Sequence, residues 1–149
     1  MPFQLEKFQS ELKRNGLASA LGLLNQPVNH RYTGVYQLRD GNLCNVELYD
    51  KEGEVKPEFL MEVPLHDSFC QFVLRDGVFR TSDTGKDDRL DGHKYQGVLL
   101  SYHGVPVLDN RGELFGTLCH FDALQRDLSD EDFELLQHAA RLIAPYVAR

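Results

Sequence analysis

The apolar positions near the start of the chain recur every three or four residues, which is the spacing of one face of a helix. Leu5, Phe8 and Leu12 form this stripe, charged residues stand between them, and Gly16 ends the pattern. Residues 17–24 show a second, shorter helical pattern. The sequence therefore predicts two helices at the N-terminus, the first of them amphipathic.

The last part of the chain gives the clearest helical pattern. Ser129 stands three residues before Asp132, a near-match to the capping box, in which the third residue is normally Glu or Gln. Pro145 is expected to kink or end the helix, because proline has no backbone N–H to donate. One face of the expected helix carries the apolar residues Phe133, Leu136, Ala140, Ile143 and Val147.

The middle of the chain is dominated by short strand-like runs separated by turn residues. Asp40-Gly41-Asn42 and the segment 109–112 both read as hairpin loops between such runs. Strands joined mostly by hairpins, with helices gathered at the ends of the chain, predict an α+β fold with an antiparallel sheet. The expected strands cover residues 32–38, 43–49, 78–82, 98–108 and 113–121.

Between the second and third expected strands, a short helix is predicted. Asp67 or Ser68 can cap its start, and Gly77 suits the left-handed conformation that ends many helices. Residues 83–97, which follow the next strand, are polar and rich in glycine without a clear period. We expect this segment to be a long ordered loop or lid.

Composition limits the class of protein. The chain has 149 residues, enough for one domain that buries a core without disulfides or metals. A net charge of −7 with scattered basic residues argues against a nucleic-acid partner. Cys44, Cys70 and Cys119 are too few and too far apart for a disulfide framework or a CxxC metal site. With no signal peptide and no membrane-length apolar run, a soluble cytoplasmic protein is expected.

An ordered set of short motifs resembles bacterial GAF domains. The motifs are residues 64–70 (PLHDSFC), 88–90 (DRL), 102–107 (YHGVPV), 109–112 (DNRG) and 116–119 (GTLC), followed by Asp122 and Leu128-Ser129. The resemblance covers about residues 63–143. It implies one GAF domain over residues 1–149, with a core at about 28–145 and N-terminal helices at 1–26. The implied fold has about six antiparallel strands, terminal helices on one face and a lidded ligand pocket on the other.

The resemblance also implies where a ligand binds. The family turns one face of the two central strands toward the pocket, and side chains alternate along a strand. Gly104 and Gly116, which are expected to lie opposite each other across the hairpin, would leave room above the sheet. We predict one small polar ligand, whose identity and charge stay open, and no cofactor. The expected contacts are Asp83, Arg89, His93 and Tyr95 from the lid and Tyr102, Cys119 and Phe121 from the strands.

Other candidate sites have weaker support. Cys70 is expected in the first turn of a helix, where a thiol pKa falls, so it is a possible redox thiol. A buried core cysteine is the favoured interpretation, because free cysteines are usually buried. Cys119-His120 is unsuited to a bilin attachment site, because neighbours in a strand point to opposite faces. The acidic residues 83–91 lack the spacing of an EF-hand, and the six histidines lack zinc-site spacing, so no metal is predicted.

Three functions follow from these observations. The first is a non-catalytic ligand sensor in signal transduction, which would act through a signalling protein partner. The second is an enzyme similar to the free methionine-(R)-sulfoxide reductases, which are also single GAF domains. It is disfavoured because Gln96 stands where that family has its nucleophilic cysteine. The third is a ligand-free dimerisation module. The stripe on residues 5–12 has no obvious place in the core, and an exposed stripe predicts a homodimer through the terminal helices; the alternative is that it packs back against the last helix of the same domain.

Overall fold

A computed structural model describes residues 2–54 and 60–147 of the chain. Its centre is a six-stranded sheet in the order β3-β2-β1-β6-β5-β4, and every neighbouring pair is antiparallel. The predicted α+β class and antiparallel sheet are therefore confirmed. The strands are β1 (Tyr32–Arg39), β2 (Asn42–Asp50), β3 (Glu62–Pro64), β4 (Phe79–Thr81), β5 (Ser101–Leu108) and β6 (Leu114–Asp122).

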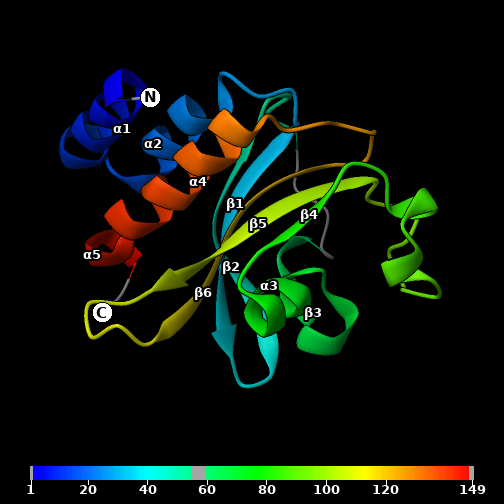
Figure 1. Cartoon of the computed structure of the whole chain (residues 1–149). Helices are drawn as coiled ribbons and strands as arrows, with labels where there is room; N and C mark the ends of the chain where they lie inside the picture. Colours follow the sequence, from blue (N-terminus) through cyan, green and yellow to red (C-terminus); the bar gives the residue numbers. More distant parts are fainter. Residues whose placement is uncertain (1, 55–59, 148–149) are drawn as a thin grey trace.

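The helices divide between the two faces of the sheet. The terminal helices α1, α2, α4 and α5 lie together on one face, and α3 lies on the other (Figure 1). This is the arrangement that the family resemblance implied. None of the described helices is long and apolar enough to cross a membrane. Their bounds are α1 (Pro2–Asn15), α2 (Leu17–Asn25), α3 (Cys70–Asp76), α4 (Asp130–Leu142) and α5 (Ala144–Val147).

Most of the turn and cap residues set the ends of these elements as the sequence predicts, but Phe69, not Asp67 or Ser68, stands at the N-cap of α3. Asp40 and Gly41 form the two-residue turn between β1 and β2, with φ angles of 52° and 80°. Such positive angles suit the turn type that matches the twist of a hairpin. Gly77 ends α3 with a φ of 89°, and the Ser129 hydroxyl accepts a hydrogen bond from Asp132 N (3.1 Å) at the start of α4. Helix α4 ends before Pro145.

The two faces of the sheet bury two separate apolar clusters. The helix-side core lies between the sheet and the terminal helices, and includes Val35, Val105, Leu118, Leu136 and Ile143. The loop-side core lies under α3 and the segment 83–97, and includes Tyr36, Phe69, Leu90, Tyr102 and Phe121. Strands β1, β5 and β6 are thus buried on both faces, and each alternate side chain contributes to a different core.

The stripe on the first helix belongs to the helix-side core. Phe8 is 1% exposed, Leu12 is 2% exposed, and Leu5 is partly buried against the same cluster. Helix α1 packs on both α2 and α4. The expectation that this stripe stays exposed is therefore wrong, because the domain's own helices cover it. The predicted homodimer through the terminal helices loses the observation on which it rested.

Gly104 and Gly116 lie at different positions along the β5–β6 pair. Gly104 pairs with Cys119 and Gly116 pairs with Val107, so the expectation that they lie opposite each other is wrong. A Cβ added at Gly116 would lie 1.8 Å from the carbonyl oxygen of Tyr36. That is far inside van der Waals contact, so β1 and β6 can approach as they do only with glycine here.

Three histidines form a buried polar row on the helix side of the sheet. His103 and His120 are paired across β5 and β6, and Thr33 is paired with His120 across β1 and β6. His30 Nε2 lies 3.0 Å from His103 Nδ1, and Thr33 Oγ1 lies 2.6 Å from His120 Nδ1. Asn25 Nδ2 donates to Thr33 Oγ1 (2.8 Å) and to the His30 carbonyl oxygen (3.0 Å).

Burial keeps this histidine row neutral. It lowers the pKa of His30 to about 4 and that of His103 to about 3, and it holds the pKa of His120 well below the ordinary range. Asp122 favours the charged form of His30, whereas Arg126 opposes it, and neither outweighs the loss of hydration.

The close contact at Gly116 predicts that Gly116→Ala strongly destabilises the domain. We expect a loss of more than about 3 kcal/mol in the free energy of unfolding, in the range of severe steric substitutions. Urea unfolding followed by circular dichroism measures it. Gly85→Ala is the matched control, because its Cβ would meet only the flexible Asp83 carboxylate at 3.3 Å. Equal unfolding midpoints for the two variants would show that the strands can separate without cost.

The histidine row predicts that the free energy of unfolding decreases as the pH is lowered. The unfolded chain binds protons at the ordinary histidine pKa of about 6.5, and the folded chain does not until lower pH. This stability is present above pH 6.5 and is lost as the pH falls towards about 4. Each histidine contributes a slope of up to about 1.4 kcal/mol per pH unit.

Urea unfolding at several pH values between about 7.5 and 4.5 checks this slope. His103→Gln should reduce it, and the exposed His66→Gln should leave it unchanged. A free energy of unfolding that is constant over this range in the wild type would contradict the assignment of neutral buried histidines.

Candidate functional site

The loop-side core encloses a small cavity between the sheet and α3. Its volume is about 50 Å³. Tyr102, Cys119 and Phe121 form its floor, because alternation along β5 and β6 turns these side chains to the same face of the sheet. The other lining residues are Tyr36, Leu60, Val63, Ser68, Phe69, Cys70, Tyr95 and Leu99.

Aromatic contacts hold the floor of the cavity in place. The Phe121 ring stacks on Tyr32 with a centroid separation of 5.0 Å, and Tyr102 packs against Phe69 at 5.7 Å. The Tyr36 hydroxyl donates to the carbonyl oxygen of Leu60 (2.7 Å). Burial raises the pKa values of Tyr36 and Tyr102 well above the ordinary range, so both phenols stay neutral.

Polar atoms of the cavity wall gather around one sulfur. Cys70 Sγ lies 3.1 Å from Tyr102 Oη and 3.2 Å from Thr117 Oγ1. The Cys119 thiol, on the same wall, donates to the carbonyl oxygen of Gly34 (3.7 Å). Among the described residues, the side chains that line the cavity include no Asp, Glu, Lys, Arg or His.

Four of the seven predicted contact residues line this cavity: Tyr95, Tyr102, Cys119 and Phe121. Asp83 and Arg89 lie in a separate open hollow on the surface. Asp83 instead accepts a hydrogen bond from Gly85 N (3.0 Å). The Arg89 guanidinium pairs with Asp87, whose pKa it lowers to about 2, and also lies over the Phe79 ring. The expectation that Asp83 and Arg89 face the pocket is wrong, because nearer partners in the chain hold both side chains.

His93 lies behind the cavity wall instead of in it. Its ring stacks on Phe69 at 4.5 Å, and its Nε2 lies 3.3 Å from the carbonyl oxygen of Ser68. His93 therefore holds in place the residues just before α3, which form one end of the cavity wall. Its contact with a ligand would be indirect.

The segment 83–97 is fastened to the domain by hydrogen bonds. The Thr84 hydroxyl donates to the carbonyl oxygen of Leu99 (2.8 Å) and accepts from Gly97 N (2.9 Å). Gln96 accepts a hydrogen bond from Gly92 N (3.1 Å) and donates to the carbonyl oxygen of Thr84 (3.1 Å). Gln96 thus closes the loop on itself. The segment extends to one side of the sheet in Figure 1.

Sequence reasoning missed several lining residues. Tyr36 could have been found, because it lies two and four residues from Gly34 and Tyr32 on the same face of an alternating strand. Phe69 directly precedes α3 and lies in the loop-side core. Leu60, Val63 and Leu99 lie outside long regular elements, and no spacing rule in the sequence points to them.

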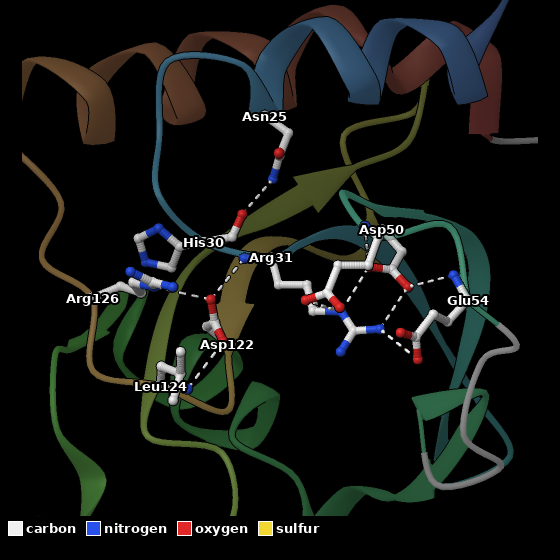
Figure 2. Close-up of polar contacts among 9 residues, drawn as sticks. Asn25, His30, Arg31, Asp50, Glu54, Asp122, Leu124 and Arg126 are labelled. Carbon is white, nitrogen blue, oxygen red and sulfur yellow. Dashed lines mark hydrogen bonds and ion pairs between the residues drawn. The ribbon is translucent and has the colours of Figure 1, made fainter.

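A second polar cluster joins the ends of β1, β2 and β6 (Figure 2). The Asp122 carboxylate accepts from Arg31 N (2.9 Å) and Arg126 Nε (3.0 Å), and the Arg31 guanidinium binds Asp50 through Nε at 2.7 Å. The hydrogen bond from Arg31 lowers the pKa of Asp50. These charges satisfy one another, so the cluster stabilises strand ends. Within residues 2–54 and 60–147, no group of three or more His, Cys, Asp or Glu is arranged to hold a metal ion.

Solved structures with the same fold include GAF domains of other proteins and free methionine-R-sulfoxide reductases. The GAF domain of an Acinetobacter phosphoenolpyruvate-protein phosphotransferase superposes with a TM-score of 0.77 at 15% identity, covering 98% of this chain and 91% of that one. The type II free methionine-R-sulfoxide reductase of Thermoplasma acidophilum gives 0.68 at 23% identity, with 97% and 94% covered. A phycocyanobilin-bound GAF domain of a cyanobacterial phytochrome gives 0.72 at 14% identity, with 97% and 91% covered.

At these identities the likeness establishes the fold and leaves the activity open. No curated protein sequence matches the chain. The sequence model of the GAF domain family matches residues 17–146, which is most of the chain and includes every residue that lines the cavity. The chain therefore belongs to the GAF domain family.

Proposed function

We propose that this GAF domain is a non-catalytic sensor that binds a small molecule in the loop-side cavity. The observation that carries the proposal is the cavity itself, which lies on the sheet face opposite the terminal helices. Aromatic and aliphatic side chains form most of its wall, and a few polar atoms converge on one side. That combination is typical of small-molecule sites.

The wall favours a neutral ligand. Burying an unpaired charge costs far more than burying a neutral polar group, and the described lining offers no charged partner. Tyr102 Oη and Cys70 Sγ can meet one hydrogen-bonding group of the ligand. The polar ligand expected from the composition of segment 83–97 is therefore revised to a mainly apolar molecule with a single polar group.

The size of the cavity couples binding to a movement of its wall. A volume of about 50 Å³ is well below the roughly 300 Å³ of an ordinary ligand pocket. A ligand larger than a few atoms must displace part of the wall, which includes Tyr95 near the end of the segment 83–97 and Leu99 just after it. Displacing them would change the surface beside Arg89 and Asp87. We propose that a signalling protein reads this change.

A methionine sulfoxide reductase is the second candidate, and one observation favours it: two thiols, Cys70 and Cys119, share the cavity. Other features oppose it. Gln96 occupies the position of the nucleophile and bonds within its own loop. Free methionine sulfoxide is a zwitterion, and the described lining has no charge to pair with its ammonium or carboxylate.

Binding in the cavity predicts a specific pattern in a thermal-shift screen of metabolites. A hit at 100 times its dissociation constant should stabilise the wild type by about 2.7 kcal/mol. Leu99→Phe should abolish the shift by filling the cavity, and Arg89→Ala should retain it, because Arg89 lies outside the wall. A hit that stabilises all three proteins equally would place the site elsewhere. If no compound stabilises the wild type, the ligand-free module is favoured.

A reductase would consume free methionine-(R)-sulfoxide. We expect no such turnover by this protein. With thioredoxin and its reductase as electron donors, free methionine-(R)-sulfoxide should be consumed no faster than in the absence of the protein. The reason is the missing nucleophile at Gln96. Consumption of NADPH in the coupled assay is the measurement. Turnover that disappears in Cys70→Ser but persists in Cys44→Ser would refute the sensor proposal in favour of catalysis.

A further inference from the structure

Two thiols from distant parts of the sequence meet in the wall of the loop-side cavity. Cys70 is the first residue of α3, and Cys119 lies in the middle of β6. Both side chains are buried and both line the cavity, and Cys70 Sγ lies 3.2 Å from the hydroxyl of Thr117, which is two residues from Cys119 on the same face of β6. Cys44, the third cysteine, lies on β2 and is not among the lining residues.

The two thiols differ in their surroundings. Hydrogen bonds from Cys119, Thr117 and Tyr102 outweigh burial and lower the pKa of Cys70. Burial, together with the interaction with Cys70, raises the pKa of Cys119 well above its ordinary range. The hydroxyls of Tyr102 and Thr117, 3.1 Å and 3.2 Å from Cys70 Sγ, can both donate to a Cys70 thiolate, whereas Cys119 faces the carbonyl oxygen of Gly34, which can only accept. A thiolate beside a protonated thiol is the arrangement that a nucleophilic and a resolving cysteine require.

The cavity restricts which oxidant can reach Cys70. Its volume is about 50 Å³, whereas one water molecule occupies about 30 Å³ in the liquid. A peroxide of two or three heavy atoms fits this space beside the sulfur. A tripeptide disulfide does not fit unless the wall opens.

We propose that Cys70 and Cys119 are a redox site, in which hydrogen peroxide that enters the cavity converts the two thiols into a reversible disulfide. This site does not depend on the ligand under Proposed function, because the peroxide acts on the unliganded chain. It adds oxidation as a second input to the same cavity.

The chemistry balances in two steps. The Cys70 thiolate attacks one peroxide oxygen, so that an S–O bond forms, the O–O bond breaks, and hydroxide leaves and takes up a proton as water. Cys119 then attacks the Cys70 sulfur, the S–S bond forms, and the S–O bond breaks. The second hydroxide takes the proton of the Cys119 thiol and leaves as water. The pair loses two electrons, peroxide gains them, and a dithiol reductant reverses the change.

The disulfide would have a mechanical effect on the cavity. It would tie the first residue of α3 to the central strand β6, and the helix could no longer move away from the sheet. Wall movement at α3 would then be blocked, whereas movement near Tyr95 would remain possible. Oxidation would also remove the Cys70 thiol from hydrogen bonding with Tyr102.

The test uses the full chain in the Cys44→Ser background, treated with a small excess of hydrogen peroxide at neutral pH. We expect the loss of both remaining thiols, a decrease in intact mass by two hydrogens, and a Cys70–Cys119 linked peptide after proteolysis. Dithiothreitol should restore both thiols. In the Cys119→Ser variant, dimedone present while the peroxide-treated chain is unfolded should capture a sulfenic acid at Cys70.

A second variant keeps the test valid if Cys119→Ser does not fold. Thr117→Val has a similar shape and removes one donor to Cys70 Sγ. One hydrogen bond of ordinary strength corresponds to about a fivefold change. Oxidation at pH 7 should therefore slow about fivefold, and the rate should recover at higher pH. A purely structural role would leave the pH dependence of the rate unchanged.

Two results would overturn the proposal. In the first, Cys70 and Cys119 remain fully alkylatable after peroxide treatment of the folded Cys44→Ser chain. In the second, peroxide oxidises the wild type through Cys44 or links two chains, without forming the Cys70–Cys119 peptide. Either result leaves the ligand-binding proposal intact, because the thermal-shift screen is carried out on the reduced protein.

Discussion

The close pairing of β1 with β6 is the constraint on which the rest of this structure depends. Gly116 lets the backbone of β6 pass against the carbonyl of Tyr36, and the register of the two central strands follows from this contact. That register turns Cys119 toward α3 and His120 toward the terminal helices. Since side chains alternate along a strand, a slip of one residue would exchange the contents of the two cores.

The sheet separates two kinds of buried polar chemistry. On the helix side, His30, His103 and His120 are kept neutral by burial; His30 is hydrogen-bonded to His103, and His120 to Thr33. On the loop side, the polar atoms surround the thiol of Cys70 and border open space. The first arrangement contributes to a packed core, and the second borders a cavity. One fold thus keeps two buried polar clusters apart by the thickness of a single sheet.

The parts that sequence reasoning predicted are those set by local or alternating patterns. The turn at Asp40-Gly41, the cap at Ser129 and the inward faces carrying Tyr102 and Cys119 each follow from a spacing of a few residues. Strand β3 was missed, because its three residues are defined only by pairing with β2. Asp83 and Arg89 were misplaced, because composition identifies a polar loop but not the neighbour that each side chain will bind.

The burial of the first helix has a consequence for where this folding unit begins. The family match starts at residue 17, after α1 has ended. Yet Phe8 and Leu12 are as deeply buried as the residues of the central strands, and α1 packs on the last long helix as well as on α2. The segment that the family model matches and the segment that packs as one core therefore differ by helix α1. A chain cut at the family boundary would leave apolar surface of α2 and α4 open to water, and would be prone to aggregate.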